Sequence, residues 1–294
     1  MVNGKVASDS YWRTGASTVE AFPMQLQMFH THPVVMEAPH WHAQVEVNFI
    51  VEGKVHYRMA EREVLLTKGD LCLFWGGIPH QMDWRSDDTI YAGAHLPLVH
   101  FFRLNLPTGV QQHLMAGQVL LLRATDPADC CNFERWNLYA RSGDATKAAH
   151  AVNELLLRIE RMRFEPYELL PGVGVATAAE EFDQRALPLA LRLCTYIADN
   201  FRDDIGIADI AAEFAIHPKY AMSVFRRSTG MTLNEYLNLL RLSYAQAMLM
   251  REEDANVLHI AMESGFGSLS AFNKSFRRLA GMTPSSFRRA GSTA

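Results

Sequence analysis

The segment 39–53, PHWHAQVEVNFIVEG, carries side chains that could bind a metal ion or a small ligand. His40 and His42 are separated by one residue, and Glu46 follows a short distance downstream. Alternate residues of an extended strand share a face, so these three side chains would point to the same side. Another histidine, His80, lies in the sequence GGIPH. Three imidazoles and a carboxylate are suitable ligands for iron, manganese, zinc or nickel.

The same residues would also suit a sugar, or a polar core that holds no ligand. Trp41, Trp75 and Trp84 offer apolar faces to a pyranose ring, and Arg58 can donate hydrogen bonds to its hydroxyls. Ligand pockets are commonly apolar with a few well-placed polar groups, which is the composition found here.

The glycines near these histidines match the two-part motif of the cupins. The first part is the His-x-His-x-x-x-Glu sequence with Gly53 after it, and the second is Gly69…Gly77-x-x-His80. Glycines permit the turns between strands that would bring His80 opposite the first part. The motif predicts a small barrel around this polar cluster. Its spacing alone leaves a metal site, an effector pocket and a polar core open.

Residues 22–125 are predicted to form that barrel, because short β-like runs such as QVEVNFIV, DLCLFW and TIYAGAHL alternate with turns. Residues 130–164 are predicted to be helical. Within them Val152, Leu155 and Ile159 share one face of a helix. We expect this stripe to pair with a second copy of the chain, and packing against the chain's own barrel is the alternative.

The bulk composition is that of an ordinary globular protein, with 49% hydrophobic and 20% charged residues. No apolar run is long enough to span a membrane, and no signal peptide is recognisable. The cysteines form no C-x-x-C pair, so we expect reduced thiols in the cytoplasm. The net charge of −4 argues against a protein that coats nucleic acid. It is uneven, because 12 Lys/Arg and 10 Asp/Glu after residue 186 leave the C-terminal part weakly basic.

The predicted fold class is α+β, with a cupin-like barrel and helical dimerisation segment in residues 1–164 and an all-α unit in residues 187–294. Residues 165–186 carry Pro, Gly and small residues without periodicity, which is typical of an interdomain linker.

The C-terminal unit contains a duplication. FRRSTGMT at 225–232 recurs as FRRLAGMT at 276–283, and IAAE upstream of the first is echoed by IAME upstream of the second. Each copy is predicted as helix, short turn, helix, which is the helix-turn-helix of DNA-binding proteins. Between them residues 232–252 are predicted as one helix of about 30 Å, close to the turn of B-DNA at about 34 Å. Two recognition helices could then enter successive major grooves. A helical bundle without a DNA role is the alternative.

The spacing Arg241, Ala245 and Leu249, followed by IA…GF…F…FRR…GMTP…FR, resembles the AraC/XylS family of bacterial transcription regulators, over roughly 187–288. Helix residues aligned with the family's groove contacts would lie on the DNA-facing sides: Lys219, Met222, Ser223 and Arg226 in the first unit, and Leu269, Ser270, Asn273 and Lys274 in the second. Three arginines suit phosphate contacts better than base reading: Arg227, Arg277 and Arg278. The core is expected to hold Ile210, Ala211, Phe225, Ile260, Ala261 and Phe276.

The resemblance implies a regulator without enzymatic activity, an activator of a carbohydrate-utilisation operon controlled by a sugar such as an α-galactoside. It implies double-stranded DNA, RNA polymerase and a second copy of the chain as partners, and no cofactor, metal or membrane. The expected effector-binding residues are His40, Trp41, His42, Glu46, Arg58, Trp75, His80 and Trp84. The alternative is a metal-dependent cupin enzyme, such as a dioxygenase or isomerase, fused to a DNA-binding domain.

Overall fold

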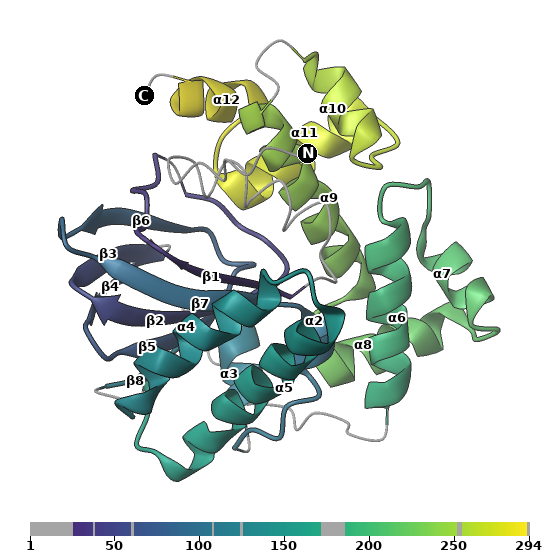
Figure 1. Cartoon of the computed structure of the whole chain (residues 1–294). Helices are drawn as coiled ribbons and strands as arrows, with labels where there is room; N and C mark the ends of the chain where they lie inside the picture. The colour runs from purple at the N-terminus through teal and green to yellow at the C-terminus, as the bar shows by residue number, and fades with distance from the viewer. Residues whose placement is uncertain are drawn as a thin grey trace.

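The computed structural model has a sheet-rich N-terminal part and a helical C-terminal part, which confirms the predicted α+β class (Figure 1). The residues that the structure describes are 26–37, 39–59, 62–107, 109–123, 126–171, 186–251 and 255–292. Among them, no helix has both the length and the apolar character needed to cross a membrane.

Two antiparallel sheets make up the N-terminal part. One has six strands in the order β1-β7-β2-β5-β8-β9, and the other has three in the order β4-β3-β6. Their bounds are β1 Gln27–Thr31, β2 Val45–Glu52, β3 Lys54–Met59, β4 Arg62–Thr67, β5 Leu71–Trp75, β6 His80–Arg85, β7 Ile90–Leu96, β8 Val119–Leu122 and β9 Glu168–Leu170. Apolar side chains from both sheets, including Ile50, Tyr57, Phe74 and Met82, form one buried cluster between them.

Strand β9 corrects the predicted domain boundary. Glu168–Leu170 was expected in the linker, but it pairs with β8 and completes the edge of the larger sheet. The N-terminal unit therefore extends at least to Leu170, because a strand held by ladder hydrogen bonds is part of the sheet. Most of the predicted linker, residues 172–185, lies outside the described residues.

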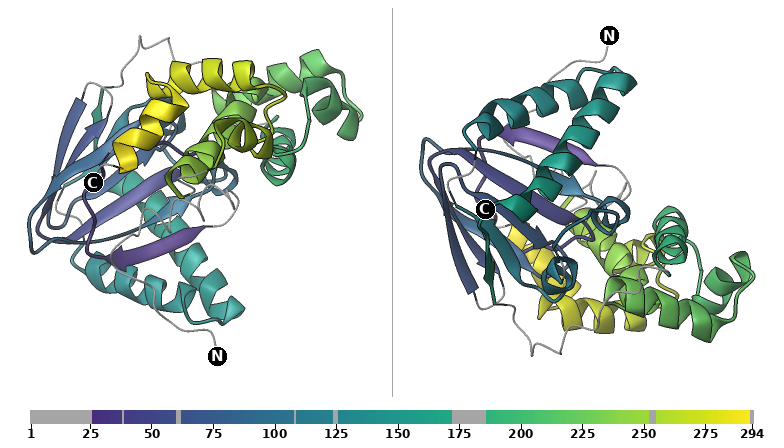
Figure 2. Two further views of the ribbon diagram at one scale, coloured as in Figure 1. Left: turned by 90° about the horizontal axis from the view of Figure 1, so that it is seen from above. Right: turned by 90° about the horizontal axis from the view of Figure 1, so that it is seen from below.

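Helices cover the outer face of the six-stranded sheet. Val45, Val47 and Phe49 alternate along β2 and belong to a second apolar cluster. Phe49 stacks on Phe133 of α4 (Ala128–Ala140), with ring centroids 5.0 Å apart. The neighbouring helix α5 (Ala145–Arg161) lies beside α4 in both views of Figure 2. Both faces of β2 are thus buried, and the intervening Glu46 and Asn48 face the barrel interior.

The apolar stripe of α5 packs within the chain. Leu155 and Ile159 are each 1% exposed, and Val152 is partly exposed. The alternative interpretation therefore holds for Leu155 and Ile159, because side chains buried against their own barrel have no surface left for a second copy. Dimerisation stays a prediction.

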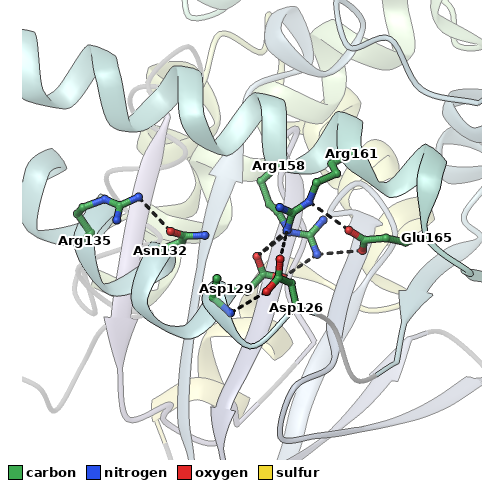
Figure 3. Close-up of polar contacts among 8 residues, drawn as sticks. Asp126, Asp129, Asn132, Arg135, Arg158, Arg161 and Glu165 are labelled. Atoms are coloured by element: carbon green, nitrogen blue, oxygen red, sulfur yellow. Dashed lines mark hydrogen bonds and ion pairs between the residues drawn. The ribbon is translucent and has the colours of Figure 1, made fainter.

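A buried ion pair joins α4 to α5 (Figure 3). Arg158 donates from Nε and Nη2 to the two carboxylate oxygens of Asp129, each at 2.7 Å, and Nη2 also donates to Glu165 at 3.1 Å. The partly exposed side chain of Arg161 forms further ion pairs with Asp126 and Asp129. Two parallel bonds between guanidinium and carboxylate fix orientation as well as distance, so this pair sets how the helices lie together.

The C-terminal part confirms the duplicated helix-turn-helix units. The helices are α6 Leu187–Asn200, α7 Ile207–Glu213, α8 Pro218–Thr229, α9 Leu233–Arg251, α10 Val257–Glu263, α11 Leu269–Ala280 and α12 Pro284–Ser292. The hydroxyl of Ser268 accepts from the Ala271 amide and caps α11. Gly230 and Gly281 end α8 and α11 with φ of +78° and +70°, which is the left-handed C-cap that glycine favours. All six expected core residues are buried.

The two parts are packed together. The second apolar cluster runs from the outer face of the large sheet into α6, α9 and α11 without interruption. Two short helices, α2 Leu98–Phe101 and α3 Val110–Met115, are not predicted from the sequence, and α2 contacts α6. The 3₁₀ helix η2 Met162–Phe164 ends the segment that is predicted to be helical. Figure 2 shows the helical part, green to yellow, against one side of the barrel.

Candidate functional site

The barrel brings the four motif residues together. One ligand atom from each of His40, His42, Glu46 and His80 lies within 4.8 Å of the others. Each residue is at most 7% exposed. Glu46 is placed by β2, and His80 begins β6. His40 reaches it through a β-bridge in which the two residues exchange backbone hydrogen bonds of 2.9 Å.

Glu46 is the centre of the cluster. Its Oε1 lies 2.9 Å from His42 Nε2 and 3.0 Å from His80 Nε2, and its Oε2 accepts from Asn48 Nδ2 at 2.7 Å. His95 also belongs here, with Nε2 3.8 Å from Oε1. His95 is not recognisable from local spacing, because it joins the cluster through the register of β7 against β2, which pairs His95 with Glu46.

The tautomer of His80 makes the cluster suitable for a cation. His80 Nδ1 lies 2.9 Å from the carbonyl oxygen of Ile78, a contact that requires a proton on Nδ1. In the neutral ring, Nε2 then presents a lone pair to the Glu46 carboxylate. Two acceptors repel at 3.0 Å. Either a second proton on the ring or a bound cation relieves this repulsion, and a carbonyl on the far nitrogen is the usual support of a metal-binding histidine.

The donor set fits a divalent transition metal ion. Imidazole nitrogens suit zinc, nickel and iron, and the carboxylate supplies a negative charge. Two ligand atoms at about 2.1 Å from one ion are at most about 4.2 Å apart. The ligand atoms, all within 4.8 Å, therefore need to close by less than about 1 Å. An ion held by His40, His42, Glu46 and His80 would supply a Lewis acid to any ligand beside it.

The pKa values of the cluster follow from burial. Burial, reinforced by His80 and His42, holds the pKa of His40 well below its usual range, and burial lowers that of His42 as well. Burial alone would raise the pKa of Glu46, but the neighbouring His80 and His42 hold it well below its ordinary value. Neutral imidazoles at His40 and His42 beside an ionised Glu46 are among the protonation states that metal binding requires.

Acid should destabilise the metal-free protein through His95. Burial, followed by the charge of His42, lowers the pKa of His95 from 6.5 to about 3. Between these values the unfolded chain binds more protons, so the free energy of unfolding falls as pH falls, by up to about 1.4 kcal/mol per unit. In urea unfolding at pH 7 to 4 with EDTA, His95→Asn should show a shallower decline than the wild type. An unchanged slope would contradict the assignment.

The remaining predicted effector residues are not gathered at the cluster. Trp75 and His80 line a small open cleft with apolar side chains. Arg58 and Trp84 lie on the outer face of the small sheet, where Arg58 pairs with Asp83 at 2.8 Å and Trp84 is 49% exposed. Alternation with the buried Tyr57 and Met59 turns Arg58 outward. Trp84 is turned outward by a β-bulge in β6, where the register against β3 shifts between the pairs Tyr57–Met82 and His56–Trp84. Trp41 points into the helical part.

The predicted DNA-facing residues lie on exposed sides of α8 and α11. Leu269 is partly buried, and the rest are exposed: Lys219, Met222, Ser223, Arg226, Arg227, Ser270, Asn273, Lys274, Arg277 and Arg278. The motif residue Arg241 has a structural role instead. It donates to the carbonyls of Phe201, Asp203 and Ile205 and so ties α9 to the segment after α6.

Comparison with known proteins agrees with the division of the chain into a sheet-rich N-terminal part and a helical C-terminal part. A cupin domain model matches residues 27–92, and a helix-turn-helix domain model matches residues 210–290. The chain is 28% identical over 258 residues to the melibiose operon regulatory protein of Escherichia coli (strain K12), covering 87% of this chain and 85% of that protein. It is 24% identical over 266 residues to the transcriptional activator RhaR of Salmonella dublin, covering 87% and 89%. The structure of ToxT from Vibrio cholerae O395 matches 92% of this chain and 98% of that chain at 12% identity and a TM-score of 0.48.

The chain thus joins a cupin domain to a helix-turn-helix domain of AraC type, the combination of a DNA-binding transcription regulator. It is a homologue of the melibiose operon regulatory protein and of RhaR, which are regulators of the AraC family.

Proposed function

We propose that the chain binds specific DNA sites and activates a carbohydrate-utilisation operon in the cytoplasm, in response to a sugar bound by its cupin domain. The observation that carries the proposal is the pair of exposed recognition faces on α8 and α11. The names of the relatives support the regulated process, since one is the melibiose operon regulatory protein and another a transcriptional activator. RNA polymerase and a second copy of the chain are the further partners we propose.

The length of the helix between the two helix-turn-helix units is close to one turn of B-DNA. Helix α9 has 19 residues, which corresponds to about 28 Å of helix. One helical turn of B-DNA is about 34 Å, so a single chain can address two successive major grooves on one face of the duplex.

The second recognition helix should read bases through Asn273 and Lys274, both exposed on α11. An amide can pair with adenine and an ammonium with guanine, each worth about 1–3 kcal/mol of discrimination. We expect Lys274→Ala to weaken binding to the cognate promoter more than to random DNA in gel-shift titrations at one salt concentration. Lys147→Ala, on the exposed side of α5, should change neither. Equal loss on both DNAs would make Lys274 a phosphate contact.

The proposed sugar site is the cleft beside Trp75, next to the cluster of His40, His42, Glu46 and His80. An indole face for the ring and polar groups for the hydroxyls are what a sugar such as an α-galactoside requires. Thermal unfolding against a panel of galactosides, pentoses and common hexoses, with and without EDTA, tests this. A ligand at 100 times its dissociation constant adds about 2.7 kcal/mol. A shift with one sugar class supports the proposal, and no shift with any sugar contradicts it.

A metal-dependent enzyme is the second candidate, and the ligand set within 4.8 Å is the observation that favours it. It requires turnover of a substrate by the metal-loaded chain. The regulator requires only that ligand binding favours one arrangement of the domains over another, for which a difference of about 1–3 kcal/mol is enough.

A further inference from the structure

One tripeptide, His40-Trp41-His42, serves both parts of the chain. Its two histidines lie in the cluster, whereas the indole of Trp41 lies against the second helix-turn-helix unit. The ring packs edge-on to Phe276 of α11 at 5.5 Å and against Phe287 of α12 at 5.6 Å between centroids. Trp41 is 1% exposed, so the helical part covers it.

Helix α9 also holds the backbone of the tripeptide. The carbonyl oxygen of Trp41 accepts hydrogen bonds from Ser243 Oγ at 3.4 Å and from Gln246 Nε2. These two polar side chains of α9 are 2% and 3% exposed. Burying polar groups in an apolar core costs free energy unless they are hydrogen-bonded. The hydrogen bonds to the Trp41 carbonyl therefore offset part of the cost of burying these two side chains of α9.

The barrel clamps the same tripeptide from the other side. His40 exchanges backbone hydrogen bonds with His80, and the amide of His42 donates to the carbonyl of Gly76 at 2.8 Å. With both flanking residues fixed in the barrel and the middle one fixed in the helical part, the segment has little freedom of its own. A displacement of the histidines must therefore move the Trp41 peptide against α9 and α11.

We propose that Trp41 couples binding of a divalent transition metal ion at His40, His42, Glu46 and His80 to docking of the second helix-turn-helix unit on the barrel. The histidines and Trp41 share one stretch of backbone, so an ion that fixes the histidines also fixes the Trp41 peptide in its docked position. By linkage, the factor by which the ion strengthens docking equals the factor by which docking strengthens binding of the ion, so substitutions in the helical part that loosen the docking weaken metal binding. The coupling concerns the regulation of the proposed DNA-binding function and rests on it for its biological consequence.

The test is a titration of the full-length, metal-free protein with Co²⁺, followed by the visible absorption of the bound ion. Gln246→Ala removes a donor to Trp41 without touching the barrel, and we expect it to weaken Co²⁺ binding about fivefold or more. Asn234→Ala, an amide on the exposed side of the same helix, is the matched control and should bind as the wild type does. Ser243→Ala provides a second, milder variant that should change the affinity in the same direction.

The reciprocal effect gives a second readout. Zn²⁺ should slow amide hydrogen exchange around Phe287 in α12 of the wild type, and have no such effect on His80→Ala. Wild-type affinity in folded Gln246→Ala and Ser243→Ala, or failure of the wild type to bind Co²⁺, would overturn the coupling. Gel shifts with the metal-free protein test the DNA-binding function separately, so that failure of the one is distinguished from failure of the other.

Discussion

His80→Ala should abolish metal binding and leave the DNA binding of the metal-free protein unchanged. His80 is one of the four residues of the ligand set and is 0% exposed. Its Nδ1 contact with the Ile78 carbonyl aims Nε2 into the cluster. Loss of an outer partner of a metal ligand typically costs about 10–100-fold in affinity, so loss of the ligand itself should cost more than about 100-fold. The recognition faces lie on α8 and α11, outside the barrel, and retain their side chains.

The measurement is Zn²⁺ binding by competition with a chromophoric chelator, together with gel shifts and circular dichroism of the same preparation. His56→Ala is the matched control, because His56 lies on the outer face of β3 and contacts Asp83 at 2.6 Å instead of the cluster. Undiminished Zn²⁺ affinity in His80→Ala would show that the ion binds elsewhere. Loss of metal-free DNA binding in a folded variant would contradict the separation of the two sites.

Asp129→Ala should lower the free energy of unfolding by about 3–5 kcal/mol. The change leaves the Arg158 guanidinium buried between α4 and α5, and within the described part of the chain Glu165 is then its remaining acidic partner, at 3.1 Å. An uncompensated buried charge is the costly outcome, whereas an apolar pair of similar volume is commonly neutral. The double variant Asp129→Leu with Arg158→Met should therefore recover most of the loss.

Urea unfolding followed by circular dichroism measures these differences. The control is Arg135→Ala on the same helix α4, where the ion pair with Glu154 is partly exposed at 3.1 Å and is worth about 0–1 kcal/mol. If Asp129→Ala and Arg135→Ala cost the same, the buried pair does not determine how α4 and α5 pack.

The helix-turn-helix units could be predicted from the sequence because their signals are local. Pro218 at the start of α8, Ser268 as the cap of α11 and the glycines after both helices mark the ends within a few residues. Repetition of the same string then shows that both copies build the same unit. Helix α5 was predicted for the same reason, but periodicity shows only that a stripe is buried, and cannot tell which surface buries it.

The cluster could be predicted only in part. His40, His42, Glu46 and His80 share a motif. His95 joins the cluster through the pairing of β7 with β2, and Asn48 joins it because it lies two residues after Glu46 on β2. The location of Trp41 depends on how the domains dock, a contact between residues about two hundred positions apart. Residue type alone favours Arg58 and Trp84 for the pocket, whereas strand alternation turns Arg58 outward and a β-bulge in β6 turns Trp84 outward.

The proposed function depends on one chain reading two successive major grooves of the same DNA. Hydroxyl-radical footprinting on a promoter fragment selected by the full-length protein measures this most directly. We expect two protected regions about 10 base pairs apart on one face of the duplex for each bound chain. Removal of the proposed base-reading side chains of α11 by Asn273→Ala with Lys274→Ala should weaken one region and spare the other. A single protected region, or the same pattern on every sequence, would contradict a two-unit sequence-specific regulator.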